Sequence, residues 1–534
     1  MTRLPPIAAD RRWVGLVCLT AIGLAQAGTM LVAAFATRDV ISALRSGQAA
    51  PPAEALTGLI AAGALMFALR SIEGAVAERA GQSFASAIRR RLFLHMSRLP
   101  VSTVTERRAG AMALRYVGDL GALKGWVSKG LARLISAAMT VPAAFLILYL
   151  LHPALAVGAA APIAGALLAI LCLGRPLAGA HADLRAQRAR LAASMAERLP
   201  QALALRRSGR LNTELRRLAE RSKSIALAAT YRAWLTETVR ALPDIASGVA
   251  GAICLWICFV DALPVEDAVA ALTALALVSW PLRRLADVSD RHKAFVVAAA
   301  KLEATLSAKT MRRPRSRTPR ADAPVLEISA LRLTDCSPPV SFAVQQGQTV
   351  RLTGLSGSGK SRLLAVAAGL DRAPTGRVSV LGLPPVAVAA GRVLYLGRFS
   401  PHLKGTLRRA CTLGLARPVE DAEIRAAFDR AGLMGVHDRL GGLSGQVAEG
   451  RRNLTSTECS GILLIRGLLA KAELALLDAD EIGLKEPGIA LLLEHFARHR
   501  TATVIVSSEG LPRAHIATTI QMAGQERLEV LTGA

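Results

Sequence analysis

The chain has 534 residues with a formal net charge of +27 at pH 7, and 52% of its residues are hydrophobic while only 4% are aromatic. Such a charge is typical of nucleic-acid-binding proteins, but the arginines lie mainly beside apolar stretches and no basic and aromatic reader motif is present, so we expect no nucleic-acid partner. Seven scattered cysteines without metal-ligand spacing argue against a zinc site or a disulfide framework. The composition favours a multi-domain protein in contact with a membrane lipid bilayer.

Six apolar stretches in the first 305 residues predict membrane-spanning helices, rich in small residues that allow close helix packing. The first stretch has the alternative of a secretory signal, because Ala25-Gln26-Ala27 resembles a cleavage site, but it continues unbroken past that point, which favours a retained span. His152-Pro153 forms a short hinge between the third and fourth spans, and Pro281 is expected to interrupt the sixth. The approximate bounds of the spans are 13–36, 56–69, 134–151, 154–174, 243–260 and 268–282.

Polar side chains are few within these spans, and the candidates for lining a cavity are Gln26, Arg70, Glu73 and Asp244. Arg70 and Glu73 stand about one helical turn apart, just after the second apolar stretch. We expect them to pair with each other at the membrane edge, and the alternative is that they face a cavity.

Two long arginine-rich stretches with helical spacing, 75–132 and 175–240, separate the spans on one side, whereas the connections on the other side are short. Positively charged loops remain in the cytoplasm. The extensions and both termini are therefore predicted to be cytosolic, in a multi-pass protein of the plasma (inner) membrane.

Residues 354–361 are Gly-Leu-Ser-Gly-Ser-Gly-Lys-Ser, which fits the loop G-x-x-x-x-G-K-[ST] that binds nucleotide phosphates. Glycines allow backbone N–H groups to approach the phosphates, Lys360 would reach the β- and γ-phosphates, and the Ser361 hydroxyl would face Mg²⁺. A strand pattern at 349–352 and a helical pattern at 362–368 give this motif its required context, which argues against a chance glycine-rich turn. We predict that ATP and Mg²⁺ are bound by Gly354, Ser356, Gly357, Ser358, Gly359, Lys360, Ser361 and Arg362.

From residue 325 the pattern changes to short alternating strands and helices, as expected of an α/β nucleotide-binding domain. The predicted fold is an all-α six-helix transmembrane domain with long cytosolic helical extensions, followed by an α/β P-loop nucleotide-binding domain. Its expected parts are a cytosolic segment (1–12), the transmembrane domain (13–305), a basic linker (306–323) and the nucleotide-binding domain (324–534).

Together these features resemble a half-transporter of the ATP-binding-cassette (ABC) exporters, and the likeness covers nearly the whole chain. It implies that Asp478, at the end of the apolar strand 474–478, holds Mg²⁺ through water together with Ser361. Residues 443–446, Leu-Ser-Gly-Gln, look superficially like the family signature, but they lie too far from Asp478 and no helical pattern follows them. The offset of the family instead places the signature loop at Leu454, Thr455, Ser456, Thr457 and Glu458.

Several positions depart from the family pattern. Ala479 replaces the Glu that polarises the attacking water, so no catalytic residue is intact at this position. Arg398 stands where a Gln is expected, and Glu509 (or Ser508) stands where a His is expected. The remaining departures are Ser456 and Thr457 in place of the two signature glycines, and the lack of an adenine-stacking aromatic residue near Asp335. We therefore predict that the cassette binds ATP but hydrolyses it slowly.

The resemblance favours a subunit of an exporter-type ABC transporter, in which residues 115–123 and 197–205 would correspond to the coupling helices. Two copies of this chain would form two sites that both lack the Glu and both face a signature without glycines, so we expect a heterodimer with a second half-transporter. The alternative is a membrane protein that binds ATP for regulation and does not pump. The sequence does not identify the transported substrate.

Overall fold

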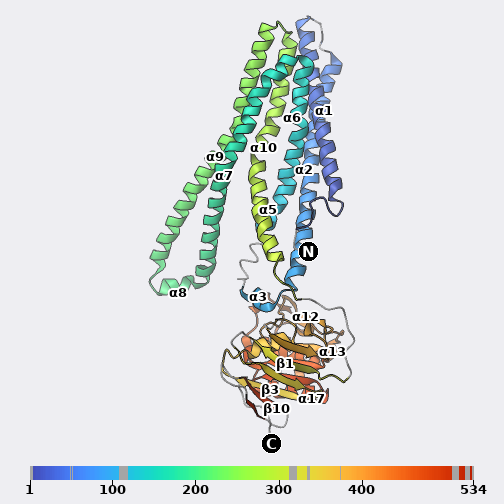
Figure 1. Cartoon of the computed structure of the whole chain (residues 1–534), viewed down its shortest axis with the longest axis vertical. Coiled ribbons are helices and arrows are strands. Elements are labelled where there is room, and N and C mark those ends of the chain that lie inside the picture. The colour runs from blue at the N-terminus through green and yellow to red at the C-terminus, as the bar shows by residue number, and fades with distance from the viewer. Residues whose placement is uncertain are drawn as a thin grey trace. The chain divides into compact units, whose positions relative to one another are not determined.

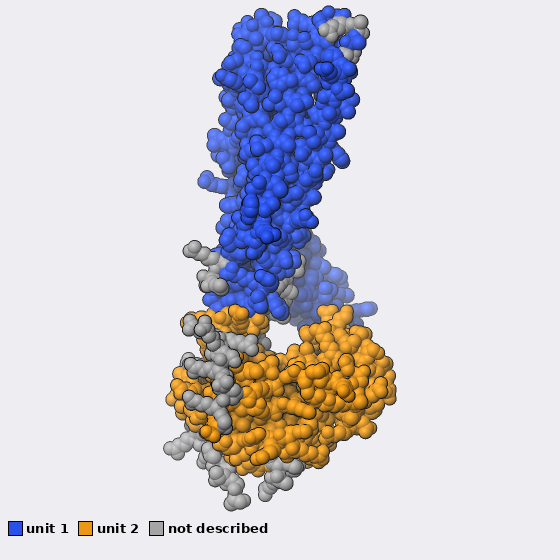
Figure 2. All heavy atoms as spheres, turned by 90° about the vertical axis from the view of Figure 1, so that its right-hand side faces the viewer, with its two compact units in different colours: residues 1–95, 109–308 blue, residues 96–108, 309–534 orange. Residues whose placement is uncertain are grey.

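The computed structural model describes residues 4–47, 50, 52–106, 118–311, 322–333, 337–372, 375–507, 516–522 and 529–531. The chain divides into two compact units, which are coloured separately in Figure 2. Unit 1 comprises Met1–His95 and Ala109–Ala308, and unit 2 comprises Met96–Arg108 and Lys309–Ala534.

Unit 1 is built from long helices (Figure 1). In chain order they are α1 (Arg12–Arg45), α2 (Ala53–Met96), α5 (Leu120–Gly125), the π-helical turn η2 (Trp126–Leu131), α6 (Ala132–Leu151), α7 (Pro153–Arg198), the 3₁₀ turn η3 (Leu199–Gln201), α8 (Ala202–Arg207), α9 (Leu211–Val260) and α10 (Val265–Leu306). Among the described residues, six helical segments are long and apolar enough to cross a membrane, which confirms the predicted number of spans.

The helices extend well beyond the apolar stretches that revealed them. The second stretch ends near residue 69, yet α2 continues to Met96 because the polar residues that follow keep helical spacing. The expected interruption at Pro281 is wrong, since α10 continues from Val265 to Leu306 with this proline inside it. A proline removes one backbone hydrogen bond, and long membrane helices tolerate that loss. The predicted hinge at His152 is confirmed, because this residue is extended between α6 and α7 and Pro153 begins α7.

The expected pair between Arg70 and Glu73 is also wrong. The Glu73 side chain is buried inside unit 1, where it accepts a hydrogen bond from Gln26 Nε2 on α1 at 2.9 Å and pairs with Arg284 on α10 at 3.5 Å. The Arg70 guanidinium instead lies over the ring of Trp280. The alternative prediction, that polar side chains in the spans face the interior, therefore describes Glu73 better.

The core of unit 1 is rich in alanine between larger side chains. Ala34, Ala159 and Ala271 are fully buried beside Ile147 and Leu155 in one cluster. Small residues let the helix axes approach closely, which is the usual basis of packing between membrane helices. Helices α7 and α9 lie side by side and are connected through α8 (Figure 1).

Unit 2 contains a six-stranded sheet in the order β11-β10-β3-β9-β8-β5, in which all neighbours are parallel except β10 and β11. A three-stranded antiparallel sheet has the order β2-β1-β4, and β6 pairs with β7. The strands are β1 (Leu326–Arg332), β2 (Val340–Val344), β3 (Thr349–Gly354), β4 (Thr375–Val380), β5 (Val393–Leu396), β6 (Gly405–Thr406), β7 (Gln446–Val447), β8 (Leu474–Asp478), β9 (Ala502–Val506), β10 (Thr518–Met522) and β11 (Glu529–Leu531).

Every residue of β8 and β9 is buried, as expected for central parallel strands covered by helices on both faces. The helices of unit 2 are α3 (Val101–Glu106), α11 (Lys360–Ala367), α12 (Leu407–Thr412), α13 (Asp421–Arg430), α14 (Met434–Arg439), α15 (Ser456–Leu469), α16 (Ala479–Ile482) and α17 (Glu486–Arg498), with 3₁₀ turns η4 (Pro385–Ala387) and η5 (Glu449–Arg451). This α/β domain after six apolar helices confirms the predicted fold class.

Residues 96–108 belong to unit 2, although the predicted transmembrane domain 13–305 contains them. The Val101 amide donates to the Leu370 carbonyl at 2.9 Å, and the Ser102 hydroxyl donates to Asp371 Oδ1 at 2.7 Å. Most of the predicted basic linker, residues 312–321, lies outside the described residues.

Candidate nucleotide site

The predicted phosphate loop connects β3 to α11 at the carboxyl end of the strand. Gly354, Gly357 and Gly359 have φ values of +143°, +85° and +94°, a region that side chains disfavour. A Cβ added at Gly354 would lie 2.3 Å from the Met522 carbonyl oxygen, and one at Gly359 would lie 2.6 Å from Leu333 Cδ1. The loop therefore requires glycine at these positions for its backbone shape.

The charged side chains at the start of α11 take different directions. Lys360 Nζ donates hydrogen bonds to the carbonyl oxygens of Gly354 at 2.7 Å and Leu355 at 2.9 Å, so its ammonium group lies over the loop itself. The Arg362 side chain instead pairs with Asp371 at 3.5 Å. Of the two cations, the structure places Lys360 over the loop and Arg362 beside Asp371.

Asp478 ends β8 and is only 1% exposed. Burial raises the pKa of its carboxyl group, and the nearby Ser361 hydroxyl and the Glu481 backbone N–H offset part of that rise. Among the described residues, Asp478 Oδ2 and Ser358 Oγ are buried without a hydrogen-bond partner. A buried carboxylate oxygen with spare capacity next to a serine hydroxyl fits a hard divalent cation such as Mg²⁺.

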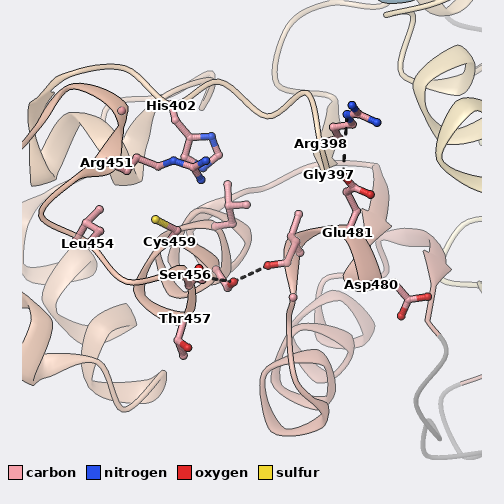
Figure 3. Close-up of a pocket in the computed structure, with 15 residues that line it drawn as sticks. Gly397, Arg398, His402, Arg451, Leu454, Ser456, Thr457, Cys459, Asp480 and Glu481 are labelled. Atoms are coloured by element: carbon pink, nitrogen blue, oxygen red, sulfur yellow. Dashed lines mark hydrogen bonds and ion pairs between the residues drawn. The ribbon is translucent and has the colours of Figure 1, made fainter. Parts of the chain in front are cut away.

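Ala479 begins α16 immediately after Asp478, and it is 1% exposed. The two acidic residues that follow it, Asp480 and Glu481, line a cavity of about 600 Å³ together with Arg398. Arg398 Nε and Glu481 Oε1 form an ion pair at 4.0 Å across this cavity (Figure 3). The phosphate loop does not line the cavity.

The predicted signature loop lies at the start of α15. Thr455 is the N-cap, its hydroxyl accepts a hydrogen bond from the Glu458 amide at 3.2 Å, and Glu458 Oε2 accepts one from the Thr455 amide at 2.7 Å. These backbone contacts and then Arg439 lower the pKa of Glu458. Ser456, Thr457 and Leu454 line the same cavity as Arg398 (Figure 3). By contrast, residues 443–446 lead into β7 and precede no helix directly.

Tyr395 on β5 is a neighbour of the site that the sequence reasoning missed. A Cβ at Gly397 would lie 2.6 Å from the Tyr395 hydroxyl oxygen and 3.2 Å from Asp478 Cβ, which places the phenol near the end of β8. Burial, followed by the charge of Asp478, raises the pKa of Tyr395 to about 12. Its position on the strand just before Arg398 was the available signal.

Some predicted positions lie outside the described residues. These are Ser508 and Glu509 at the expected histidine position, Asp335 at the expected adenine contact, and residues 115–117 of the first predicted coupling region. The second coupling region, 197–205, covers the end of α7, η3 and most of α8.

Two family models match the chain. The ABC transporter transmembrane region matches residues 13–282, and the ABC transporter model matches residues 338–479. The matched regions correspond to the six apolar helical segments and to the phosphate-loop domain that follows them. The chain belongs to the ABC transporter family, with an N-terminal transmembrane region and a C-terminal ATP-binding domain.

The individual proteins that resemble this chain share less than a third of its residues over the matched regions. The mycobactin import ATP-binding/permease protein IrtB of Mycolicibacterium thermoresistibile is 28% identical over 305 residues, 52% of this chain and 52% of that protein. The ATP-dependent lipid A-core flippase of Bordetella pertussis is 29% identical over 353 residues, 61% of this chain and 52% of the flippase. The chain thus spans about half the length of these curated relatives. A solved bacterial Atm1-family ABC exporter with ATP bound shares the fold, with a TM-score of 0.78 and 19% identity over 98% of this chain and 95% of that one.

Proposed function

We propose that this chain is a subunit of an exporter-type transporter that binds ATP with Mg²⁺ and hydrolyses it slowly, in a dimer with a second half-transporter. The observation that carries the proposal is the pairing of a well-formed phosphate loop with Ala479 directly after Asp478. The proposal locates the protein in the plasma (inner) membrane with unit 2 in the cytoplasm, because both arginine-rich extensions belong to one side.

The binding half of the proposal rests on residues 354–361 and Asp478. The positive φ values open the loop backbone to a phosphate, and Lys360 lies where it adds a positive charge. Ser361 and the partnerless Oδ2 of Asp478 would hold Mg²⁺ through water. Bound ATP supplies the phosphoryl group that is transferred to water, and Mg²⁺ neutralises the charge that develops.

The slow hydrolysis follows from the side chain at position 479. A methyl group neither orients water nor accepts its proton, and such general-base assistance is worth about 10²–10⁴ in rate. The two acidic residues that follow, Asp480 and Glu481, line a cavity that the phosphate loop does not line, and Glu481 is paired with Arg398. This arrangement supports the absence of a substitute base within the described part of the chain.

The expected partner is a different half-transporter. In a homodimer, both sites would lack the Glu and would face Ser456 and Thr457 in place of glycines, whose side chains crowd a loop that needs close backbone approach. Each nucleotide site of the dimer would combine the phosphate loop of one chain with the signature loop of the other. A partner with an intact Glu and signature would therefore supply the Glu in its own site and the signature in the site of this chain. Each of the two sites would still contain one altered component from this chain.

The test compares the purified chain alone with the chain co-expressed with a neighbouring half-transporter, in each case with and without Lys360→Ala. We expect the chain alone to bind a fluorescent ATP analogue but to hydrolyse ATP slowly, and the pair to hydrolyse faster in a way that does not depend on Lys360. Brisk hydrolysis by the chain alone would contradict the proposal. Binding without hydrolysis in every combination would favour the alternative, a membrane protein that uses ATP for regulation and does not pump.

A further inference from the structure

Two arginines of unit 1 share the ring of Trp280, which is 38% exposed. The guanidinium carbon of Arg70 on α2 lies 4.1 Å from the centre of the Trp280 ring, and that of Arg284 on α10 lies 4.2 Å from it. Both distances are well within the range of cation–π attraction. Two like charges on one ring create a local positive potential that favours an anion.

The two arginines differ in how their charge is balanced. Arg284 pairs with the buried Glu73 at 3.5 Å, and Glu73 is fixed in turn by Gln26 Nε2 at 2.9 Å, whose Oε1 accepts from the Ser136 hydroxyl at 3.0 Å. Among the described residues, no carboxylate lies within ion-pair distance of Arg70.

Several other charged residues around the stack are matched by ion pairs. Arg283 pairs with Asp244 at 2.5 Å, and Arg240 pairs with Glu237 at 2.9 Å and with Asp287 at 3.1 Å. Asp287 also pairs with Arg133. Among the residues just named, five arginines meet four carboxylates, and Arg70 is the one of these five for which no carboxylate lies within ion-pair distance. An arginine next to a membrane span that lacks an ion-pair partner is a functional-site hypothesis by default.

Two cavities of different polarity adjoin the stack. An apolar cavity of about 530 Å³ lies between α1, α2 and α10, and Arg70 is the one charged residue in its lining. A polar cavity of about 400 Å³ lies along α9 and α10 and is lined by Trp280 and Arg284. The apolar cavity is of the size that small-molecule sites have, and its hydrocarbon lining consists mainly of Met30, Ala33, Leu59, Met66, Phe67 and Leu277.

We propose that this place binds an amphiphile with an anionic head group. Its hydrocarbon chain occupies the apolar cavity, and its head group takes the charge-assisted hydrogen bonds of Arg70 beside Trp280. A cation is repelled by Arg70, whose charge no carboxylate of the described residues balances, and a small hydrophilic anion leaves the apolar lining uncovered. The inference rests on the proposed transport function, for which this amphiphile is the substrate class.

The test measures binding of radiolabelled dodecyl phosphate to the full chain in phosphatidylcholine nanodiscs without nucleotide. Dodecyltrimethylammonium and butyl phosphate serve as the cationic and the short-chain competitors. We expect dodecyl phosphate to bind at least about tenfold more tightly than either, since one charge-assisted hydrogen bond or a buried hydrocarbon chain is worth that factor. Equal affinity for the cation would overturn the role of Arg70, and equal affinity for butyl phosphate would overturn the role of the cavity.

Variants separate a binding role from a folding role. Arg70→Gln should weaken binding at least about tenfold and Arg70→Lys less, whereas Arg45→Gln, which removes an arginine paired with Glu266 away from the cavity, should leave it unchanged. Unchanged affinity in Arg70→Gln would overturn the proposal.

A second pair of variants tests the cavity without touching charge. Gly63 lines the cavity and Gly74 lies outside it on the same helix, and at both positions a Cβ meets no atom within 4 Å. Gly63→Leu should weaken dodecyl phosphate binding and Gly74→Leu should not; equal effects would overturn the assignment. Because this binding is measured without ATP, its loss leaves the proposed nucleotide function standing, and failure of ATP binding leaves this site testable.

Discussion

The phosphate loop and the cavity lined by Arg398 and Glu481 differ in how closely their residues follow the pattern of the family that the sequence resembles. On one side, the loop 354–361 has the backbone shape that phosphates require, and Asp478 retains a free oxygen. On the other side, Arg398, Ser456 and Glu481 line a cavity that the phosphate loop does not reach. Binding and hydrolysis are carried by different elements of the fold, so one can be retained while the other is lost.

The separation has a physical basis in where each function resides. Phosphate binding uses backbone N–H groups and one lysine, all within the single segment between β3 and α11. In the proposed mechanism, hydrolysis uses side chains that follow β5, β8 and β9, together with the start of α15 of a second cassette. Each of those side chains can be substituted without a change in the phosphate loop.

The largest expected effect comes from placing a carboxylate at position 479, which would remove the difference between binding and hydrolysis. Ala479→Glu in the chain paired with its partner should raise the rate of ATP hydrolysis about 10²-fold or more, because it returns general-base assistance beside Asp478. The rate is measured as phosphate release. Ala479→Gln, which has the same size and accepts no proton, should stay slow; an equal rise in both variants would show that bulk rather than basicity limits the reaction.

The binding side is tested by removing the lysine of the loop. Lys360→Ala should weaken the affinity for ATP about tenfold to a hundredfold, the worth of the hydrogen bonds that a charged ammonium makes. Isothermal titration with a slowly hydrolysed analogue measures the change. The matched control is Lys404→Ala, which removes an exposed lysine of the same domain. The affinity of this variant for ATP should equal that of the parent chain. Equal losses in both variants would contradict a specific role for Lys360.

A pH effect sharpens the assignment of Asp478 to the cation. Mg²⁺ binding requires the ionised carboxylate, which is present above the pKa and lost as the pH falls through it. Burial raises this pKa, so the affinity for Mg²⁺–ATP should begin to fall at a higher pH than an ordinary aspartate would give. Measurement of the affinity for Mg²⁺–ATP between about pH 8 and pH 4 tests this. Asp478→Asn should remove the part of the change in affinity with pH that depends on Mg²⁺. If the affinity of Asp478→Asn still changed with pH in the same way, the effect would belong to another group.

Local pattern predicted the elements that position the nucleotide site. The apolar run 474–478 matches the bounds of β8, and the strand predicted at 349–352 lies within β3, because buried parallel strands and phosphate loops are determined by neighbouring residues. Hydropathy predicted the apolar spans, and the helical spacing of the arginine-rich stretches predicted the extensions beyond them, because hydropathy marks where the apolar part of a helix ends and not where its hydrogen bonding ends.

Contacts between distant segments were beyond the sequence. The pair of Arg398 and Glu481, 83 residues apart, and the stack of Arg70 on Trp280, 210 residues apart, depend on how separate elements pack. Sequence reasoning named Arg70 and Glu73 as polar residues of interest but paired them with each other, since their spacing on one helix was the only proximity it contained. Burial of Glu73 against α1 and α10 decided the actual partners.

The smallest expected effect concerns the hydroxyl that the signature loop retains. Thr455→Ala removes the N-cap of α15 and should lower the free energy of unfolding of the domain by about 1 kcal/mol, as measured by denaturant titration. Glu458→Ala removes the reciprocal hydrogen bond of the same cap and should cost a similar amount. If Thr455 also contacts the nucleotide of the partner, only Thr455→Ala should weaken ATP-dependent association with the second half-transporter, and Thr455→Ser should restore it. Equal association in the two alanine variants would mean that Thr455 acts as a helix cap alone.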